Sequence, residues 1–416
     1  MSVPVLIHAD GLVSGEGATL RDAAVVVSSV GEVLDVGPAS ELLQRHQGAT
    51  IERVHGVVYP GLVNAHTHVE LSAMRGRVPG GRGFVEWVDA FVGHRSEVDS
   101  DDEAAGVEIA VKALDDFGVA AVGDVSNRLV AVRALARAGI GGSVFHEVFG
   151  AVKESLERAV RDLARARDEI GAWPTTDLAY AVAPHTLYTT HPEVVLQLMR
   201  DAKERGVTTT LHLAEHAAER RALESADGPM VDWLHVRTKG VADAFPWPHR
   251  GPIQHADALG ALGPHALSVH VTDATAEDVQ ILRDRNASVV LCPRSNLYIE
   301  LKLPPLPALR AAGIEAALGT DSLASNTSLD VLAEARALAD RFPAVPAREL
   351  LQMATWNGAR ALGRPDLGRI VKGAKPGVVA TLGELGELDP AAFVLQQVKA
   401  PRRWVSRRGV QKEVRS

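Results

Sequence analysis

Four residues at the ends of apolar runs have the types and spacing of a metal-ligand set. His66 and His68 stand two positions apart at the end of one run, so their side chains point to the same side of an extended strand. His212 ends a second run and Asp321 follows a third, which would complete three imidazoles and one carboxylate. This set suits Zn²⁺, with Fe²⁺ and Mn²⁺ as open alternatives. We expect one divalent metal ion at these four residues.

Two further polar residues could act beside this set. Glu215 comes three residues after His212, and a carboxylate there can take a proton from a water that the metal activates and pass it on. The alternative is a solvated carboxylate that opens the next helix. His270 ends the apolar run Ala266–Val269. We expect it to hydrogen-bond the attacking water or the substrate, with a satisfied buried histidine as the alternative.

The same residues also match a peptidase pattern. His212-Leu213-Ala214-Glu215-His216 is an H-x-x-E-H sequence, the pattern of inverted zinc peptidases. That pattern requires a helix, because its two histidines must lie one turn apart on one face. The preceding residues 207–211 are mostly β-branched and predict a strand. We therefore expect the match to be coincidental, with His216 in a loop or at a helix start.

The residues that carry this chemistry need a scaffold that brings strand ends together. After Pro60, short apolar runs alternate with helical patterns, which is typical of a parallel sheet. Eight such runs occur: Val57–Val63, Ala120–Val125, Gly142–Phe149, Leu178–Val182, Thr208–Leu213, Ala266–Val271, Ser288–Leu291 and Glu315–Leu318. The helical patterns between them include Ala104–Phe117, Leu156–Ile170, Glu193–Glu204, Ala276–Arg285 and Leu306–Ala312. Eight strand–helix repeats over about 300 residues fit a (β/α)₈ barrel, whose sites lie at the C-terminal ends of its strands.

The two ends of the chain have a sequence pattern that differs from the strand–helix alternation of its centre. Residues 3–58 contain β-branched runs between glycines, and residues 366–416 return to a strand and turn pattern. An open doubly wound sheet is disfavoured, because no Gly-rich phosphate loop follows the first run. We expect an α/β fold in which residues 59–365 form the metal-dependent barrel. Residues 1–58 and 366–416 would pair into a small β-sandwich.

The composition limits the classes of function. Of 416 residues, 44 are Lys or Arg and 52 are Asp or Glu, and the net charge of −8 argues against a nucleic-acid or anionic membrane surface. One cysteine excludes an intramolecular disulfide and favours a reducing compartment. The sequence has neither a signal-peptide pattern nor a run of about 18 apolar residues. We expect a cytoplasmic protein with a small-molecule substrate; a homodimer is compatible with the sequence, which does not fix the oligomeric state.

At these residues the sequence resembles the amidohydrolase superfamily, in its branch of hydrolytic deaminases and chlorohydrolases. The matching segments, in the family's order, are Pro60–His68, Ala183–His185, His212–Glu215, Val269–His270, Leu291–Asn296, Leu318–Ser322 and Met353–Ala359. The resemblance implies a (β/α)₈ barrel that holds one divalent metal at the four ligands above. It also implies that Asp321 accepts a proton from the bound water and that Glu215 passes it to the ring nitrogen. His270 would help to orient the water, and His185 would contact the substrate.

Two segments, His68–Ser72 and Cys292–Asn296, resemble the aminodeoxyfutalosine deaminase subgroup of this family. There Glu70 would hydrogen-bond a ribose hydroxyl and Arg294 would face a carboxylate; a helix-start carboxylate and a surface ion pair are the alternatives. Trp87 and Phe84 would wall an aromatic base, with core packing as the alternative. The segment 371–380 departs from the family pattern, because it lacks the usual acidic residue.

Together these features favour a metal-dependent aminohydrolase that releases ammonia from an aminated heterocycle. The expected substrate is an adenine nucleoside-like compound such as 6-aminodeoxyfutalosine. A chlorohydrolase or a cyclic amidohydrolase would use the same site with another leaving group, and a third alternative is a non-catalytic amidohydrolase-like scaffold. A site of the cytidine-deaminase type, which needs Pro-Cys-x-x-Cys, is excluded by the single cysteine.

Overall fold

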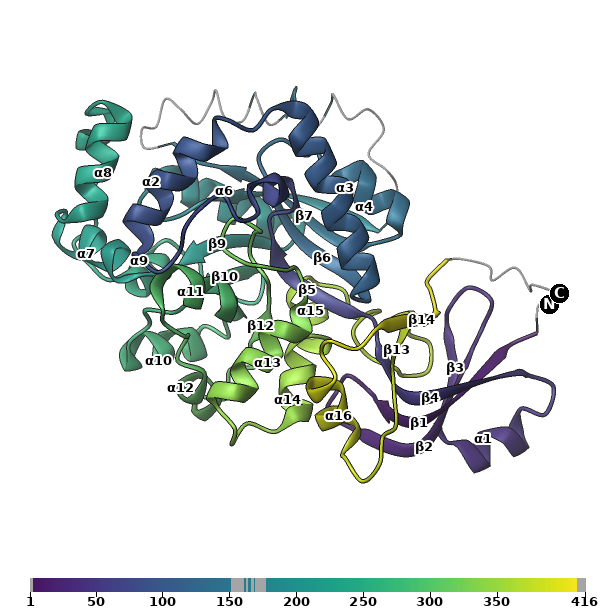
Figure 1. The fold of residues 1–416 in the computed structure, drawn as a ribbon. Helices are drawn as coiled ribbons and strands as arrows, with labels where there is room; N and C mark the ends of the chain where they lie inside the picture. Colours follow the sequence, from purple (N-terminus) through teal and green to yellow (C-terminus); the bar gives the residue numbers. More distant parts are fainter. Residues whose placement is uncertain (1–2, 151–160, 162–163, 166–167, 169–176, 410–416) are drawn as a thin grey trace.

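Eight parallel strands in two sheets occupy the centre of the molecule in the computed structural model, which describes residues 3–150, 161, 164–165, 168 and 177–409 (Figure 1). The first sheet pairs its strands in chain order: β5 (Leu62–Thr67), β6 (Val119–Ser126), β7 (Gly141–Val148) and β8 (Leu178–Pro184). The second does the same with β9 (Thr209–Leu213), β10 (Ala266–His270), β11 (Ser288–Leu291) and β12 (Ala317–Leu318). The expected α/β fold with parallel strands is confirmed.

The two parallel sheets approach each other at both of their edges. A parallel bridge joins Thr67, at the end of β5, to Asp321, just after β12. At the other edge, the His212 N–H on β9 donates to the carbonyl of His185, just after β8, at 3.1 Å. The C-terminal ends of β5 and β12 are therefore neighbours, and so are those of β8 and β9.

Helices follow the strands and cover the outer faces of the parallel sheets (Figure 1). They are α2 (Phe84–Arg95), α3 (Ser100–Asp116), α4 (Val132–Ala138), α6 (Pro192–Arg205), α7 (Ala217–Ser225), α8 (Pro229–Thr238), α9 (Pro252–Ala258), α10 (Ala276–Asp284), α11 (Pro293–Glu300), α12 (Leu306–Ala311), α13 (Val331–Arg341), α14 (Ala347–Met353) and α15 (Trp356–Ala361), with 3₁₀ helices η1 (Val69–Met74) and η2 (Val241–Ala244). The predicted helices match α3, α6, α10 and α12 to within a few residues, whereas the predicted helix 156–170 lies largely outside the described residues. Among the helices that the structure describes, none has the length and apolar character needed to cross a membrane.

A third sheet is built from both ends of the chain. Its strand order is β14-β13-β4-β1-β2-β3, with β1 (Val5–Val13), β2 (Thr19–Val27), β3 (Val33–Pro38), β4 (Thr50–Pro60), β13 (Val378–Leu382) and β14 (Arg402–Ser406). The sheet curls, so that the turn between β2 and β3 meets the C-terminal segment. There the Gly409 N–H donates to Val30 O at 3.3 Å, and the Val33 N–H donates to Ala374 O at 2.9 Å.

Three sequence expectations about these end segments need correction. The predicted strand 57–63 is two strands: Val58 in β4 pairs with Leu12, while Leu62 in β5 pairs with Val119. The chain divides at Gly61, where a Cβ atom would lie 2.6 Å from Ala120 Cβ. The end segments also contain helices α1 (Ala39–Arg45) and α16 (Pro390–Gln396), where only strands and turns were expected.

Candidate metal centre and active site

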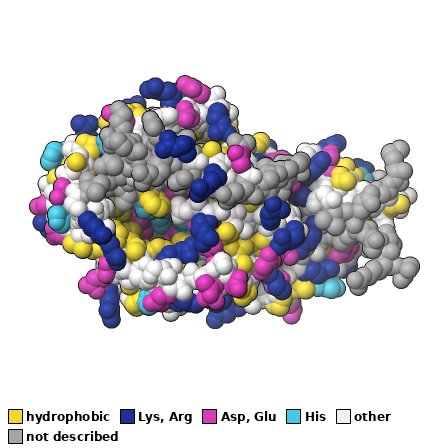
Figure 2. Space-filling view, turned by 90° about the horizontal axis from the view of Figure 1, so that it is seen from above, with side chains coloured by type: hydrophobic (Ala, Val, Ile, Leu, Met, Phe, Trp, Pro, Cys, Tyr) yellow, Lys and Arg dark blue, Asp and Glu magenta, His cyan; other side chains and the backbone are white. Residues whose placement is uncertain are grey.

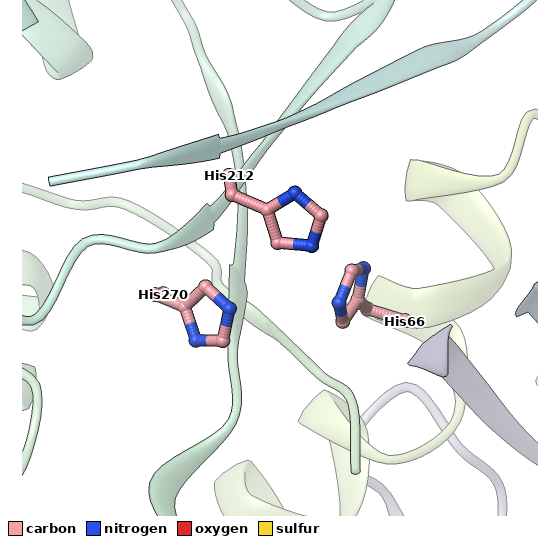
Figure 3. A group of neighbouring side chains, drawn as sticks. All are labelled: His66, His212 and His270. Carbon is pink, nitrogen blue, oxygen red and sulfur yellow. The ribbon is translucent and has the colours of Figure 1, made fainter. Parts of the chain in front are cut away.

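Three imidazoles and one carboxylate meet where β5, β9 and β12 end. His68 Nε2 lies 3.3 Å from His212 Nε2 and 3.5 Å from Asp321 Oδ1, and His66 Nε2 lies 3.7 Å from the same Asp321 oxygen. Figure 3 shows the rings of His66 and His212 turned toward each other, with the ring of His270 beside them. The ligand atoms of His66, His68 and Asp321 lie within 4.8 Å of one another, and so do those of His66, His212 and His270.

The donor set at this point fits a divalent cation. His66 is fully buried, and neither of its ring nitrogens has a hydrogen-bond partner among the described residues. Buried polar atoms in native proteins nearly always have a partner, so these nitrogens indicate a missing group. Imidazole nitrogens and a carboxylate oxygen at this spacing are the ligands that Zn²⁺ takes in catalytic sites.

Asp321 is held so that only one of its oxygens faces the imidazoles. The hydroxyl groups of Ser295 and Ser325 each donate to Asp321 Oδ2 at 2.6 Å. Although burial alone would raise the pKa of Asp321, the surrounding imidazoles hold it well below its ordinary value. Its backbone is left-handed, with φ of 55°, a strained conformation that proteins often keep at functional sites. Asp321 thus presents a charged Oδ1 toward His66 and His68.

Gly319 allows the end of β12 to lie directly against His66. A Cβ atom at this position would lie 2.7 Å from both the Cβ and the carbonyl oxygen of His66. We expect Gly319→Ala to lower the free energy of unfolding by about 1–3 kcal/mol, because backbone or His66 must move. Metal affinity should fall with it. Urea unfolding and metal titration measure both effects.

Gly48 provides the matched control for that substitution. A Cβ atom there would have nothing within 4 Å. Gly48→Ala should therefore change the free energy of unfolding by no more than about 0.5 kcal/mol. An unchanged urea midpoint in Gly319→Ala would contradict the close packing of β12 on His66.

Glu215 lies beside the imidazole cluster without belonging to either histidine group. Its Oε1 lies 3.7 Å from His270 Nε2, and burial raises its pKa well above the ordinary value. The carboxylate of Glu219, on α7, accepts the N–H groups of Ala214 and Glu215 at 3.0 and 2.7 Å, which fixes the loop after β9. A buried carboxyl group with a raised pKa is suited to holding and releasing a proton.

His270 is oriented from behind by an amide. The Asn296 Nδ2 group donates to His270 Nδ1 at 3.2 Å. A neutral ring that accepts at Nδ1 carries its proton on Nε2, the nitrogen that faces Glu215. Burial lowers the pKa of His270 well below its ordinary value, so the ring is neutral. In this tautomer His270 is a hydrogen-bond donor toward the pocket.

The H-x-x-E-H match is coincidental, as expected. His212 lies on strand β9, whereas His216 caps the N-terminus of α7 and accepts the Glu219 N–H at Nδ1. The His216 ring stacks on Phe84, with centroids 3.8 Å apart and planes 13° from parallel. The two histidines are therefore on different elements, and they do not form the helical pair of an inverted zinc peptidase.

Comparison with known proteins identifies the family. The sequence profile of the amidohydrolase family matches residues 57–400, which is most of the chain. The chain belongs to the amidohydrolase family.

Named relatives and a solved structure resemble this amidohydrolase over most of its length. It is 29% identical over 369 residues to the aminodeoxyfutalosine deaminase of Deinococcus radiodurans, covering 86% of this chain and 85% of the relative. It is 30% identical over 398 residues to the 5-methylthioadenosine/S-adenosylhomocysteine deaminase of Halobacterium salinarum, covering 92% and 85%. The crystal structure of Helicobacter pylori aminofutalosine deaminase with methylthio-coformycin superposes with a TM-score of 0.84 at 23% identity, covering 95% of this chain and 97% of that one. This amidohydrolase is a hydrolase of C–N bonds other than peptide bonds.

Of the four predicted substrate-binding residues of this amidohydrolase, His185 lies against the imidazole cluster. Its ring centroid is 5.2 Å from that of His212, and its Nδ1 is held by Thr189 Oγ1 at 2.7 Å. Glu70 is buried beside the loop after β6, where its carboxylate accepts from Ser126 Oγ (2.5 Å) and from the N–H groups of residues 127 and 128 (3.0 and 3.1 Å). Contact of Glu70 with a ribose stays a prediction.

The other two predicted substrate residues of the amidohydrolase have protein partners. The Trp87 indole packs among apolar residues and donates to Ala324 O at 3.4 Å. The Arg294 guanidinium donates to the hydroxyls of Thr327 and Ser328, and lies 3.7 Å from Glu334. Among the described residues, no contact is found between either of these side chains and the imidazole cluster, and their substrate contacts stay predictions.

Sequence reasoning missed one acidic residue in the pocket of the amidohydrolase. Glu147, near the end of β7, is buried, and its Oε1 lies 3.6 Å from His212 Nδ1. Its only signal was an acid near the end of the apolar run 142–149. Figure 2 shows a hollow in this face of the molecule, where acidic and histidine side chains lie among hydrophobic ones.

Proposed function

We propose that this amidohydrolase is a metal-dependent deaminase of an adenosine-like nucleoside, with 6-aminodeoxyfutalosine as its first candidate substrate. The observation that carries the proposal is the buried cluster of His66, His68, His212 and Asp321 with Glu215 beside it. The named deaminases among its relatives support the choice of reaction. We propose one Zn²⁺ ion at the four ligands.

We also propose that the eight parallel strands close into one (β/α)₈ barrel over residues 59–365. The Thr67–Asp321 bridge and the His212–His185 backbone hydrogen bond, at opposite edges of the two sheets, support closure. Residues 1–58 and 366–416 would then form a small β-sandwich, an arrangement supported by the curl of the third sheet. In this architecture the site lies at the C-terminal ends of the barrel strands, where enzymes of this fold bind their substrates.

The residues around the ligand set divide the proton transfers between them. When bound, the divalent metal makes water acidic enough to attack a ring carbon at neutral pH. Asp321 Oδ1, charged and fixed by two serine hydroxyls, accepts the first proton. Glu215 donates a proton to the ring nitrogen beside the attacked carbon, and it recovers a proton from the new hydroxyl group when the carbonyl forms. The proton on Asp321 passes to the amino group, which leaves as ammonia. His270 donates its Nε2–H to the water or to the oxygen that becomes negative.

Ammonia release from a nucleoside panel tests the proposal. Zinc-loaded protein would be incubated with 6-aminodeoxyfutalosine, 5′-methylthioadenosine, S-adenosylhomocysteine and adenosine, alongside a chlorinated triazine and a cyclic amide. We expect ammonia from at least one nucleoside, together with the inosine-type product. Chloride from the triazine or ring opening of the amide, without ammonia from any nucleoside, would replace deamination with one of the other two reactions. Full metal content with no turnover of any compound would favour a non-catalytic scaffold.

A further inference from the structure

Glu147 carries a buried oxygen that the metal chemistry does not use. The residue is 8% exposed, and its Oε2 accepts from Asn127 Nδ2 at 3.1 Å. Its Oε1 has no hydrogen-bond partner in the part of the chain that the structure describes. A buried acceptor without a partner is destabilising, so this oxygen calls for a donor that no described residue supplies.

A second cation does not fit this position. One oxygen of Glu147 and one nitrogen each of His185 and His212 lie within 4.8 Å of one another, which is metal-like spacing. However, His212 Nδ1 lies 3.0 Å from the carbonyl oxygen of His185, and a carbonyl can only accept. His212 Nδ1 therefore carries a proton, which leaves Nε2 for the main ligand set. The same contact already fixes the tautomer of His212, so Glu147 is not needed for that role.

The position of Glu147 relative to Glu215 limits which group of a substrate could be the donor to Glu147. Glu215 lies beside His270, and the reacting amine of a substrate must lie there. Glu147 lies instead beside Nδ1 of His212, on the edge of the ring that faces away from His68. The amino group carries the only N–H donors of an adenine base in a nucleoside, so the remaining donors that all nucleosides of the panel share are sugar hydroxyls.

We propose that Glu147 accepts a hydrogen bond from a sugar hydroxyl of the substrate and so selects ribonucleosides. This inference rests on the proposed function, since it requires a nucleoside in the pocket. His185 lies on the same side of the pocket, and the ring of the exposed Phe149 meets it edge-on with centroids 5.8 Å apart. The end of β7 thus supplies a polar contact and an apolar wall for the sugar.

A comparison of hydroxylated and dideoxy substrates tests the inference. The nucleoside that the panel shows to react fastest is compared with its 2′,3′-dideoxy analogue. Wild-type protein should prefer the hydroxylated compound by about 10- to 100-fold in kcat/KM, the size of a hydrogen bond to a charged group. Glu147→Gln keeps the shape and the contact to Asn127 but removes the charge, so it should reduce this preference by about 5- to 10-fold without loss of metal. Calorimetric binding of inosine and 2′,3′-dideoxyinosine should show the same change without turnover.

Glu103→Gln is the matched comparison, because Glu103 is a buried glutamate outside the site whose oxygens pair with Arg95 and Arg128. It should affect both substrates equally and keep the preference for hydroxyls. A full wild-type preference in Glu147→Gln, or a preference that only Glu70→Gln removes, would overturn the inference. So would a wild-type protein without any preference, a result that stands even if the variant does not fold. A metal-replete wild type that turns over no nucleoside would overturn the proposed function and this inference with it.

Discussion

Replacing Glu215 by Gln should lower kcat by about 10²- to 10⁴-fold while the protein keeps its metal. The side chain is buried beside His270, and burial raises its pKa, so it can hold a proton and deliver it to the ring. Gln has the same shape but cannot exchange that proton. Glu215 belongs to neither of the histidine groups with ligand spacing that include His66, so metal content should not change. Steady-state kinetics and metal analysis on the same sample measure the two quantities.

Glu224→Gln is the control for the Glu215 variant. Glu224 lies near the end of α7, is exposed, and among the described residues pairs with Arg220 one turn away. Its replacement should leave kcat and metal content at wild-type values. Full activity in Glu215→Gln would remove that residue from the proton transfers, whereas loss of metal would make it a ligand.

Replacing His66 by Ala should abolish metal binding and turnover together. His66 belongs to two of the three groups with ligand spacing, and its two ring nitrogens have no partner among the described residues. Loss of a residue that only orients a ligand costs about 10- to 100-fold in metal affinity, so loss of a ligand should exceed that range. Metal content after dialysis and ammonia release with added Zn²⁺ test this expectation.

His255 allows a matched substitution elsewhere in the molecule. It is buried on α9, and its Nε2 also lacks a hydrogen-bond partner among the described residues. It differs from His66 because it belongs to no group with ligand spacing in that part of the chain. His255→Gln should keep its metal and its activity. Wild-type metal content in His66→Ala would contradict the proposed ligand set.

Much of the site is predictable because each of its residues follows a recognisable apolar run. His66 and His68 close the run that becomes β5, His212 ends β9 and His270 ends β10. Parallel strands bring their carboxyl ends to one edge of a sheet, so chain position alone indicates that these residues converge. Their distances depend on side-chain packing between strands distant in sequence, and no single-sequence pattern contains that information.

Glu147 shows where sequence reasoning stops. Every residue of β7 is buried, so the strand has no alternation of exposed and buried positions that would tell which side chains face the pocket. His146 and Glu147 are equally polar neighbours, yet His146 turns to Tyr180 Oη at 2.9 Å while Glu147 turns to the imidazoles. Only the packing of β7 between its neighbours decides which of the two enters the site.

Some of the missed elements did carry a signal. Helix α16 begins with Pro390 after Asp389, whose side chain accepts the N–H groups of Ala391 and Ala392. An Asp followed by Pro is a strong helix-start pattern. The division at Gly61 was also marked, by the Pro60-Gly61 pair within the run predicted as one strand.

The pairing of β4 with β13 has a consequence for the synthesis of the chain on the ribosome. Val58 in β4 pairs with Ala380 in β13. One edge of β4 therefore stays unpaired until the central part of the chain and then β13 have been translated. At about 5–20 residues per second, this wait lasts roughly 15 seconds to a minute. During that time the edge of β4 that will pair with β13 is unpaired, and an unpaired strand edge can template aggregation. A message cut short before the codon for Val378 would leave that edge permanently uncovered, even though every residue of the proposed metal centre had been made.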